Sequence, residues 1–96
     1  MSLLGLFRRK QDNTEATRRA RLLRTGRIAD GTIIDIGADE RGAITHIFYS
    51  YEINGVEYES SQSLDETQLT RAADYAPGAA ITIRFDPRQP TNSVVV

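Results

Sequence analysis

Apolar and polar residues alternate most clearly along residues 44–60, ITHIFYSYEINGVEYES. Side chains of a β-strand point to opposite faces in turn, so an alternating run predicts a half-buried strand. One face of the predicted strand is apolar and aromatic, while the other is largely polar. The residues of the apolar face are Ile47, Tyr49, Tyr51 and Ile53.

The pair Asn54-Gly55 interrupts this alternation and predicts a two-residue hairpin turn, because both residues tolerate positive φ. Such a turn fixes the register and places Tyr51 opposite Tyr58. On the other face it places Glu52 opposite Glu57, and two like charges side by side are acceptable only in water. We therefore expect the tyrosines to lie inside a small core and not on an exposed binding platform.

Three further strands are predicted, at residues 27–37, at residues 80–86 and, after Pro90, in a short run at residues 93–96. Between the hairpin and residue 80, Ser63 and Glu66 have the spacing of a capping box. This spacing predicts a helix of about ten residues that ends near Tyr75, before the Pro77-Gly78 turn.

The segment NTEATRRARLLRTG, residues 13–26, predicts a basic amphipathic helix that ends at Gly26. Ala16, Ala20 and Leu23 recur at helical spacing and form an apolar stripe, with Leu22 beside it. Arginines at positions 18, 21 and 24 lie along another side of the same helix.

These elements predict a mostly β (α+β) fold in one domain, because 96 residues are too few for two cores. We expect a small antiparallel barrel or bent sheet of five strands, OB-like or SH3-like, with a short capped helix between strands three and four. The chain divides into an N-terminal basic arm and helix, residues 1–25, and a small β-barrel-like domain, residues 26–96.

The net charge of −1 conceals a strong asymmetry. Residues 1–27 carry eight basic and two acidic residues, whereas residues 28–96 carry four arginines and eleven acidic residues. A basic arm on an acidic body is consistent with a solvated helix face next to a frayed terminus, or with docking to an anionic membrane surface or to an acidic protein partner. Nucleic acid is the least favoured partner, because the acidic body would repel it. The candidate interaction residues are Arg8, Arg9, Lys10, Arg18, Arg21 and Arg24.

No catalytic, cofactor-binding or metal-binding constellation is predicted. The chain has no cysteine, and its one histidine, His46, falls on the polar face of a strand. We therefore expect a non-enzymatic accessory or interaction domain. The alternative is a small ligand-binding or hydrolytic β-barrel, which a pocket above about 300 Å³ with two or more buried ionisable groups would favour.

The apolar start, MSLLGLF, precedes the charges RRK, whereas a secretory signal places its charges first. No apolar run approaches the roughly 20 residues that span a bilayer. The expected location is the cytoplasm, with peripheral contact at the inner membrane face as an option.

Four features together resemble a known bacterial family, the domain of unknown function numbered 3592, over roughly residues 22–96. They are Gly26 to Gly31, Tyr49-Ser50-Tyr51, Tyr75-Ala76-Pro77-Gly78 and Phe85-Asp86-Pro87. The resemblance implies a small β-rich domain and brings no established activity or catalytic residues. Many members of that family carry flanking transmembrane helices, which this sequence lacks.

Overall fold

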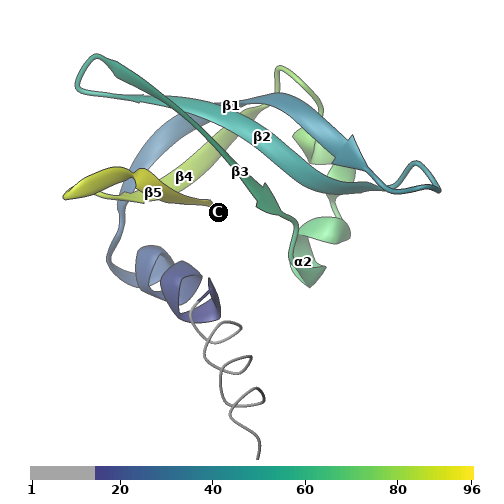
Figure 1. Cartoon of the computed structure of the whole chain (residues 1–96), viewed down its shortest axis with the longest axis horizontal. Helices are drawn as coiled ribbons and strands as arrows, with labels where there is room; N and C mark the ends of the chain where they lie inside the picture. The colour runs from purple at the N-terminus through teal and green to yellow at the C-terminus, as the bar shows by residue number, and fades with distance from the viewer. Residues whose placement is uncertain (1–14) are drawn as a thin grey trace, which may run out of the picture.

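A computed structural model describes residues 15–96 of the protein. Residues 15–25 are helical and form the described part of the N-terminal helix. Five strands and two short helical turns follow (Figure 1). In chain order they are β1 (Arg27–Ala38), β2 (Ile44–Ile53), β3 (Val56–Ser63), α2 (Glu66–Leu69), η1 (Ala72–Tyr75), β4 (Ala80–Asp86) and β5 (Gln89–Val95).

The five strands form one antiparallel sheet with the order β3-β2-β1-β4-β5. The sheet curls until its two end strands, β3 and β5, approach each other, which gives a nearly closed barrel (Figure 1). This confirms the predicted five-stranded antiparallel fold. The central strand β1 pairs along its first half with β4 and along its second half with β2.

At Gly31 the strand β1 lies close to both neighbouring strands. A Cβ at this position would lie 2.9 Å from the carbonyl oxygen of Ser50 on β2 and 3.3 Å from Cγ1 of Ile81 on β4. Only glycine permits such an approach without a shift of the backbone.

The hairpin of β2 and β3 has the predicted register. Tyr51 lies opposite Tyr58 and Glu52 opposite Glu57. Asn54 and Gly55 both have positive φ, 53° and 81°, as a type I′ turn requires. The turn fixed the register of this ribbon, and the apolar alternation together with the Glu52–Glu57 pair indicated which face enters the core.

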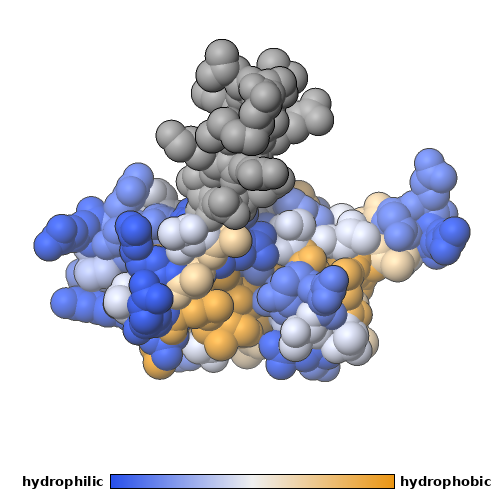
Figure 2. Space-filling model, turned by 90° about the horizontal axis from the view of Figure 1, so that it is seen from below, coloured by the Kyte–Doolittle hydropathy of each residue, from blue (hydrophilic) through white to orange (hydrophobic). Residues whose placement is uncertain are grey.

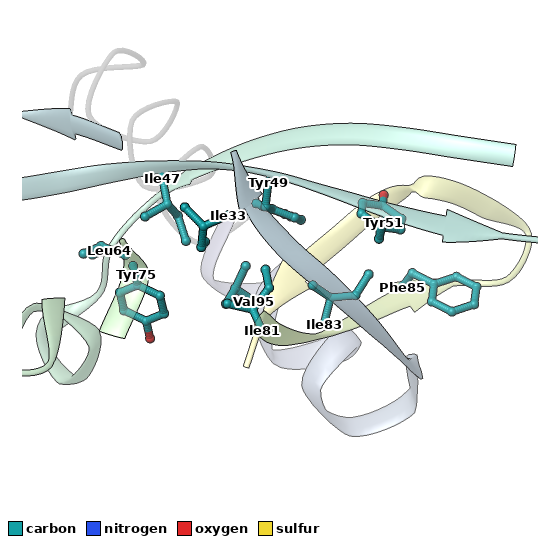
Figure 3. Packing of buried hydrophobic residues seen from close by; sticks show 10 residues of the cluster. All are labelled: Ile33, Ile47, Tyr49, Tyr51, Leu64, Tyr75, Ile81, Ile83, Phe85 and Val95. Atoms are coloured by element: carbon teal, nitrogen blue, oxygen red, sulfur yellow. The ribbon is translucent and has the colours of Figure 1, made fainter. Parts of the chain in front are cut away.

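The core fills the inside of the barrel, as the predicted faces indicated. Figure 3 shows Ile47, Tyr49 and Tyr51 of β2 opposite the buried residues of β4. Those residues are Ile81, Ile83 and Phe85, the three that the alternation in residues 80–86 places on one face. Tyr58 is half-buried and stacks on Tyr51 with 5.6 Å between ring centroids. The tyrosines of the hairpin are therefore interior residues.

The helix between β3 and β4 is shorter than predicted, and its cap lies elsewhere. Ser63 is the last residue of β3. The capping box is formed instead by Asp65, whose carboxylate accepts from the Gln68 backbone, and by the Gln68 side chain, which accepts from the Asp65 backbone. The helix ends after one turn at Leu69, and the chain continues to Tyr75 as a separate 3-10 turn. Both boxes have the same i, i+3 spacing, and the end of strand pairing selected the later one.

The last strand begins earlier than predicted, at Gln89, and Pro90 lies within it. Asp86 pairs with Gln89 and Phe85 pairs with Ser93, so residues 90–92 form an irregularity in the ladder. A proline is tolerated there because no ladder bond from its nitrogen is needed.

Candidate functional site

The N-terminal helix packs against the outside of the barrel through Leu22. Leu22 is only 4% exposed, although it lies outside the main core cluster, and the same is true of Val94 on β5, which is 3% exposed. Neighbouring residues of β5, Ser93 and Val95, face the barrel interior, so Val94 points outward, toward the side that the helix covers. Arg84 of β4 fixes the junction by donating from Nη1 to the carbonyl oxygen of Gly26 at 3.0 Å.

The predicted apolar stripe of this helix does not face the barrel. Ala16, Ala20 and Leu23 are exposed, and Leu23 retains 46% of its accessible surface. The helix is rotated about its axis because Leu22 and two hydrogen-bonding arginines occupy the contact with the barrel. The sequence showed an amphipathic helix but not which of its sides would be buried.

Arg18 and Arg19 tie the helix to the barrel, and Glu15 holds both guanidinium groups. Arg18 donates to both carboxylate oxygens of Glu15 at 2.9 and 3.0 Å, and Arg19 Nε donates to Oε1 at 2.8 Å. Arg18 Nη1 also donates to Asn92 Oδ1 (2.8 Å) and to the carbonyl oxygen of Ser93 (3.0 Å). Arg19 reaches the carbonyl oxygen of Ser63 at 3.2 Å, so the helix contacts both end strands of the sheet.

We expect the contact between the N-terminal helix and the barrel to weaken only at acidic pH. The hydrogen bond from Arg18, together with that from Arg19, lowers the pKa of Glu15 to about 2. A carboxylate with a lowered pKa contributes stability that is present above its ordinary pKa of 4.5 and is lost as the pH falls toward 2. An NMR titration of the Glu15 side-chain carboxyl carbon should show a midpoint near 2. In the Arg18→Gln variant the midpoint should rise toward 4.5, and an unchanged midpoint would contradict the assignment.

A groove of about 670 Å³ lies between the N-terminal helix and the turn that joins β4 to β5. Thr17, Arg21 and Thr25, spaced by four residues along one side of the helix, contribute one wall. Pro87 and Arg88 of the turn, with Asn92 of β5, contribute the opposite wall. Arg18 and Asp86 also line the groove, and both are half-buried, whereas Arg21 and Arg88 are exposed. The groove exceeds the 300 Å³ criterion, but its ionisable residues are not buried.

The predicted interaction residues occupy different surroundings. Arg8, Arg9 and Lys10 lie outside the described residues. Arg18 is engaged with Glu15 and β5. Arg21 and Arg24 are exposed, and Arg21 lines the groove. Sequence reasoning did not identify Arg88 or Asn92, because nothing in the sequence indicates that the turn after β4 faces the helix.

Side chains close the gap between β3 and β5, the two ends of the hydrogen-bonded strand order. Gln62 Oε1 accepts from the backbone nitrogen of Val95 (2.9 Å), and Gln68 Nε2 donates to the carbonyl oxygen of Val95 (3.0 Å). The two amides also contact each other, Gln62 Nε2 to Gln68 Oε1 at 3.4 Å. We name Gln62 and Gln68 the glutamine seam.

Two tyrosines of β2 reach β5 from inside the barrel. The hydroxyl groups of Tyr49 and Ser93 share a hydrogen bond of 2.7 Å, and Tyr51 donates to the carbonyl oxygen of Pro90. Burial raises the pKa of the Tyr51 hydroxyl above its ordinary value. The aromatic face predicted from the sequence therefore also fixes the last strand and, with it, one wall of the groove.

His46 lies on the outer face of β2 and packs against Phe48, with 5.3 Å between ring centroids. It is not among the residues that line the groove. The groove walls are formed by arginine, threonine, asparagine, aspartate and apolar residues, a set suited to holding an anion.

The family model described as "Domain of unknown function (DUF3592)" matches residues 24–96, about three quarters of the chain. The chain belongs to the DUF3592 family. This confirms the resemblance drawn from the sequence. Comparison with curated proteins and with solved structures gave no match.

The matched DUF3592 region contains the whole barrel but begins after most of the N-terminal helix. The turn wall of the groove, Pro87 to Asn92, is thus part of the family domain, whereas Thr17 and Arg21 of the helix wall precede it. Among the helices of residues 15–96, none has the length and apolar character needed to cross a bilayer.

Proposed function

We propose that this protein is a non-enzymatic interaction domain that docks to an anionic membrane surface through its N-terminal helix. The exposed side of that helix is the observation that supports the proposal. Leu23 is 46% exposed next to the exposed Arg24, and Ala16 and Ala20 extend the same apolar stripe. An apolar stripe beside cationic side chains is the pattern of helices that lie in a membrane interface.

The side of the molecule that carries this helix also carries α2 and the C-terminus (Figure 1). Each of these elements contributes an exposed apolar residue: Leu69 on α2 is 46% exposed and Val96 is 47% exposed. Figure 2 views the molecule from this side and shows apolar residues in the middle of the face with hydrophilic residues at its margins. Arginines near an anionic surface contribute about 1 kcal/mol each, in addition to the burial of apolar side chains.

A non-enzymatic role is supported by the character of the groove. Its ionisable residues are exposed or half-buried, whereas general acids and bases are usually tuned by burial and close charge partners. His46, the residue best suited to proton transfer at neutral pH, lies elsewhere, against Phe48 on the outer face of the barrel.

Vesicle co-sedimentation tests the proposal. The full chain should bind phosphatidylcholine vesicles that contain phosphatidylglycerol, and added salt should weaken the binding because it screens the arginines. Leu23→Gln should weaken binding about tenfold, since a leucine side chain loses its transfer from water. Phe48→Gln provides the matched control on the outer face of β2 and should bind like the wild type. Equal binding to neutral vesicles, or no binding to anionic ones, would refute membrane docking.

A further inference from the structure

The groove between the N-terminal helix and the β4–β5 turn lies on a different side of the helix from Leu23. Thr17, Arg21 and Thr25 form its helical wall, and they do not coincide with the stripe of Ala16, Ala20 and Leu23. We propose that this groove binds the phosphate group of a small ligand, which is a phospholipid headgroup or a soluble phosphate ester. The lipid case rests on the proposed membrane docking, whereas the soluble case is independent of it.

Two arginines from opposite walls carry the inference. Arg21 belongs to the helix and Arg88 to the turn, so a ligand between the walls can be reached by both. Within residues 15–96 the ion pairs are those of Glu15 with Arg18 and Arg19, which leaves Arg21 and Arg88 unpaired in that part of the chain. A guanidinium group matches two phosphate oxygens with parallel hydrogen bonds, and two such groups would hold a phosphate from both sides.

Neutral donors complete the groove, and the fold holds them in place. Asn92 Oδ1 accepts from Arg18 at 2.8 Å, so the asparagine side chain is oriented and its amide nitrogen remains a donor. Thr17, which carries a hydroxyl donor, lines the helix wall. Preorganised donors favour binding because less side-chain freedom is lost when the ligand arrives.

Asp86, the single acidic residue of the groove lining, stabilises the turn between β4 and β5. Its Oδ1 accepts from the backbone nitrogen of Arg88 at 2.9 Å and so fixes the turn that presents the Arg88 side chain. Arg18 is already engaged by Glu15, so Arg21 and Arg88 are the two other arginines of the groove lining, against this one carboxylate. The groove is therefore cationic on a body whose residues 28–96 carry eleven acidic residues and four arginines.

This charge distribution and the groove volume favour a small ligand. A nucleic acid would also place many phosphates against the acidic body, whereas a single phosphate group meets only the groove. The volume of about 670 Å³ lies within the range of small-molecule sites, roughly 300–1,000 Å³. It accommodates a phosphate together with the group attached to it, and Leu22 and Pro87 offer that group an apolar contact.

Inorganic pyrophosphate is the probe for the first experiment, with the full chain observed by ¹H–¹⁵N NMR. Pyrophosphate should shift the backbone amides of residues 17–25 and 86–92. The double variant Arg21→Gln/Arg88→Gln should weaken binding by about a hundredfold, since each of the two charge-assisted contacts is worth about tenfold. The matched control Arg41→Gln/Arg71→Gln removes the same charge from exposed positions outside the groove and should bind nearly as the wild type does.

Several results would overturn the inference. The first is that millimolar pyrophosphate shifts no backbone amide, and the second is that it shifts amides outside residues 17–25 and 86–92. The third is that the control variant loses as much pyrophosphate affinity as the groove variant, which would indicate general charge attraction only. If the double variant does not fold, Arg88→Gln alone is compared with Arg71→Gln by the same criterion. If the groove variant abolishes self-association in sedimentation equilibrium while pyrophosphate has no effect, the groove takes the acidic face of a second copy and the phosphate inference is wrong.

Anionic vesicles distinguish the two sources of phosphate. If the ligand is a lipid headgroup, pyrophosphate should compete with vesicle binding and the groove variant should bind vesicles weakly. If the ligand is soluble, pyrophosphate should bind without affecting the vesicles. If the protein binds pyrophosphate but not vesicles, the phosphate-binding inference for the groove stands and only the membrane docking is refuted.

Discussion

Tyr49→Ala is expected to lower the free energy of unfolding by about 4 kcal/mol, the cost of removing a large buried aromatic side chain. Tyr49 is fully buried, stacks near Tyr51 at 5.9 Å between ring centroids, and shares a hydrogen bond with Ser93. A loss of this size is a large part of the stability of a domain of this length. Urea denaturation followed by circular dichroism measures it.

The adjacent residue supplies the control. Phe48 lies on the same strand but on its outer face, where 39% of its surface is exposed, so Phe48→Ala should cost less than about 1 kcal/mol. Tyr49→Phe keeps the ring and removes only the hydroxyl, and should cost about 1 kcal/mol. If Phe48→Ala costs as much as Tyr49→Ala, the assignment of inner and outer faces in β2 is wrong.

Gln68→Ala is expected to lower the free energy of unfolding by about 3 kcal/mol. The side chain is 3% exposed, caps α2 by accepting from Asp65, and bonds the carbonyl oxygen of Val95 across the glutamine seam. Its removal leaves buried polar groups without partners, at about 1–3 kcal/mol for each. The same urea titration provides the measurement.

Gln89→Ala is the matched control, because Gln89 is an exposed glutamine at the start of β5. Its effect should stay within about 0.5 kcal/mol. A double-mutant cycle with Gln62→Ala should show that the two seam residues are coupled, because they contact each other and the same residue of β5. Equal effects of Gln68→Ala and Gln89→Ala would show that the seam does not hold the barrel closed.

Much of the barrel could be predicted because its signals are local. The period-2 alternation set the faces of β2 and β4, and Asn54-Gly55 set the register of the hairpin. For α2, the sequence predicted that a capping box is present but not which residue begins it. Ser63 and Asp65 each begin a plausible box, and the choice depended on where the pairing of β3 with β2 ends, which is at Ser63 opposite His46.

The candidate site was less accessible to sequence reasoning. Arg18, Arg21 and Arg24 could be identified as one basic helix, but their different surroundings depend on contacts with residues about seventy positions away. Arg18 is bound by Asn92 and Ser93, and Arg21 lines the groove with Arg88. Such contacts follow from how β5 returns along the barrel, and no local pattern encodes them.

By itself the sequence determined the five strands, the inward tyrosines and the charge contrast between the two ends of the chain, because alternation, turn chemistry and composition act over a few residues. Only the tertiary structure decided which side of the N-terminal helix is buried, how β3 and β5 are joined, and that a groove faces the β4–β5 turn. These features depend on side chains that meet across the barrel, where hydrogen-bond partners distant in sequence compete for the same positions. The N-terminal helix has two sides that could be buried, and the surface against which it packs determines which of them is.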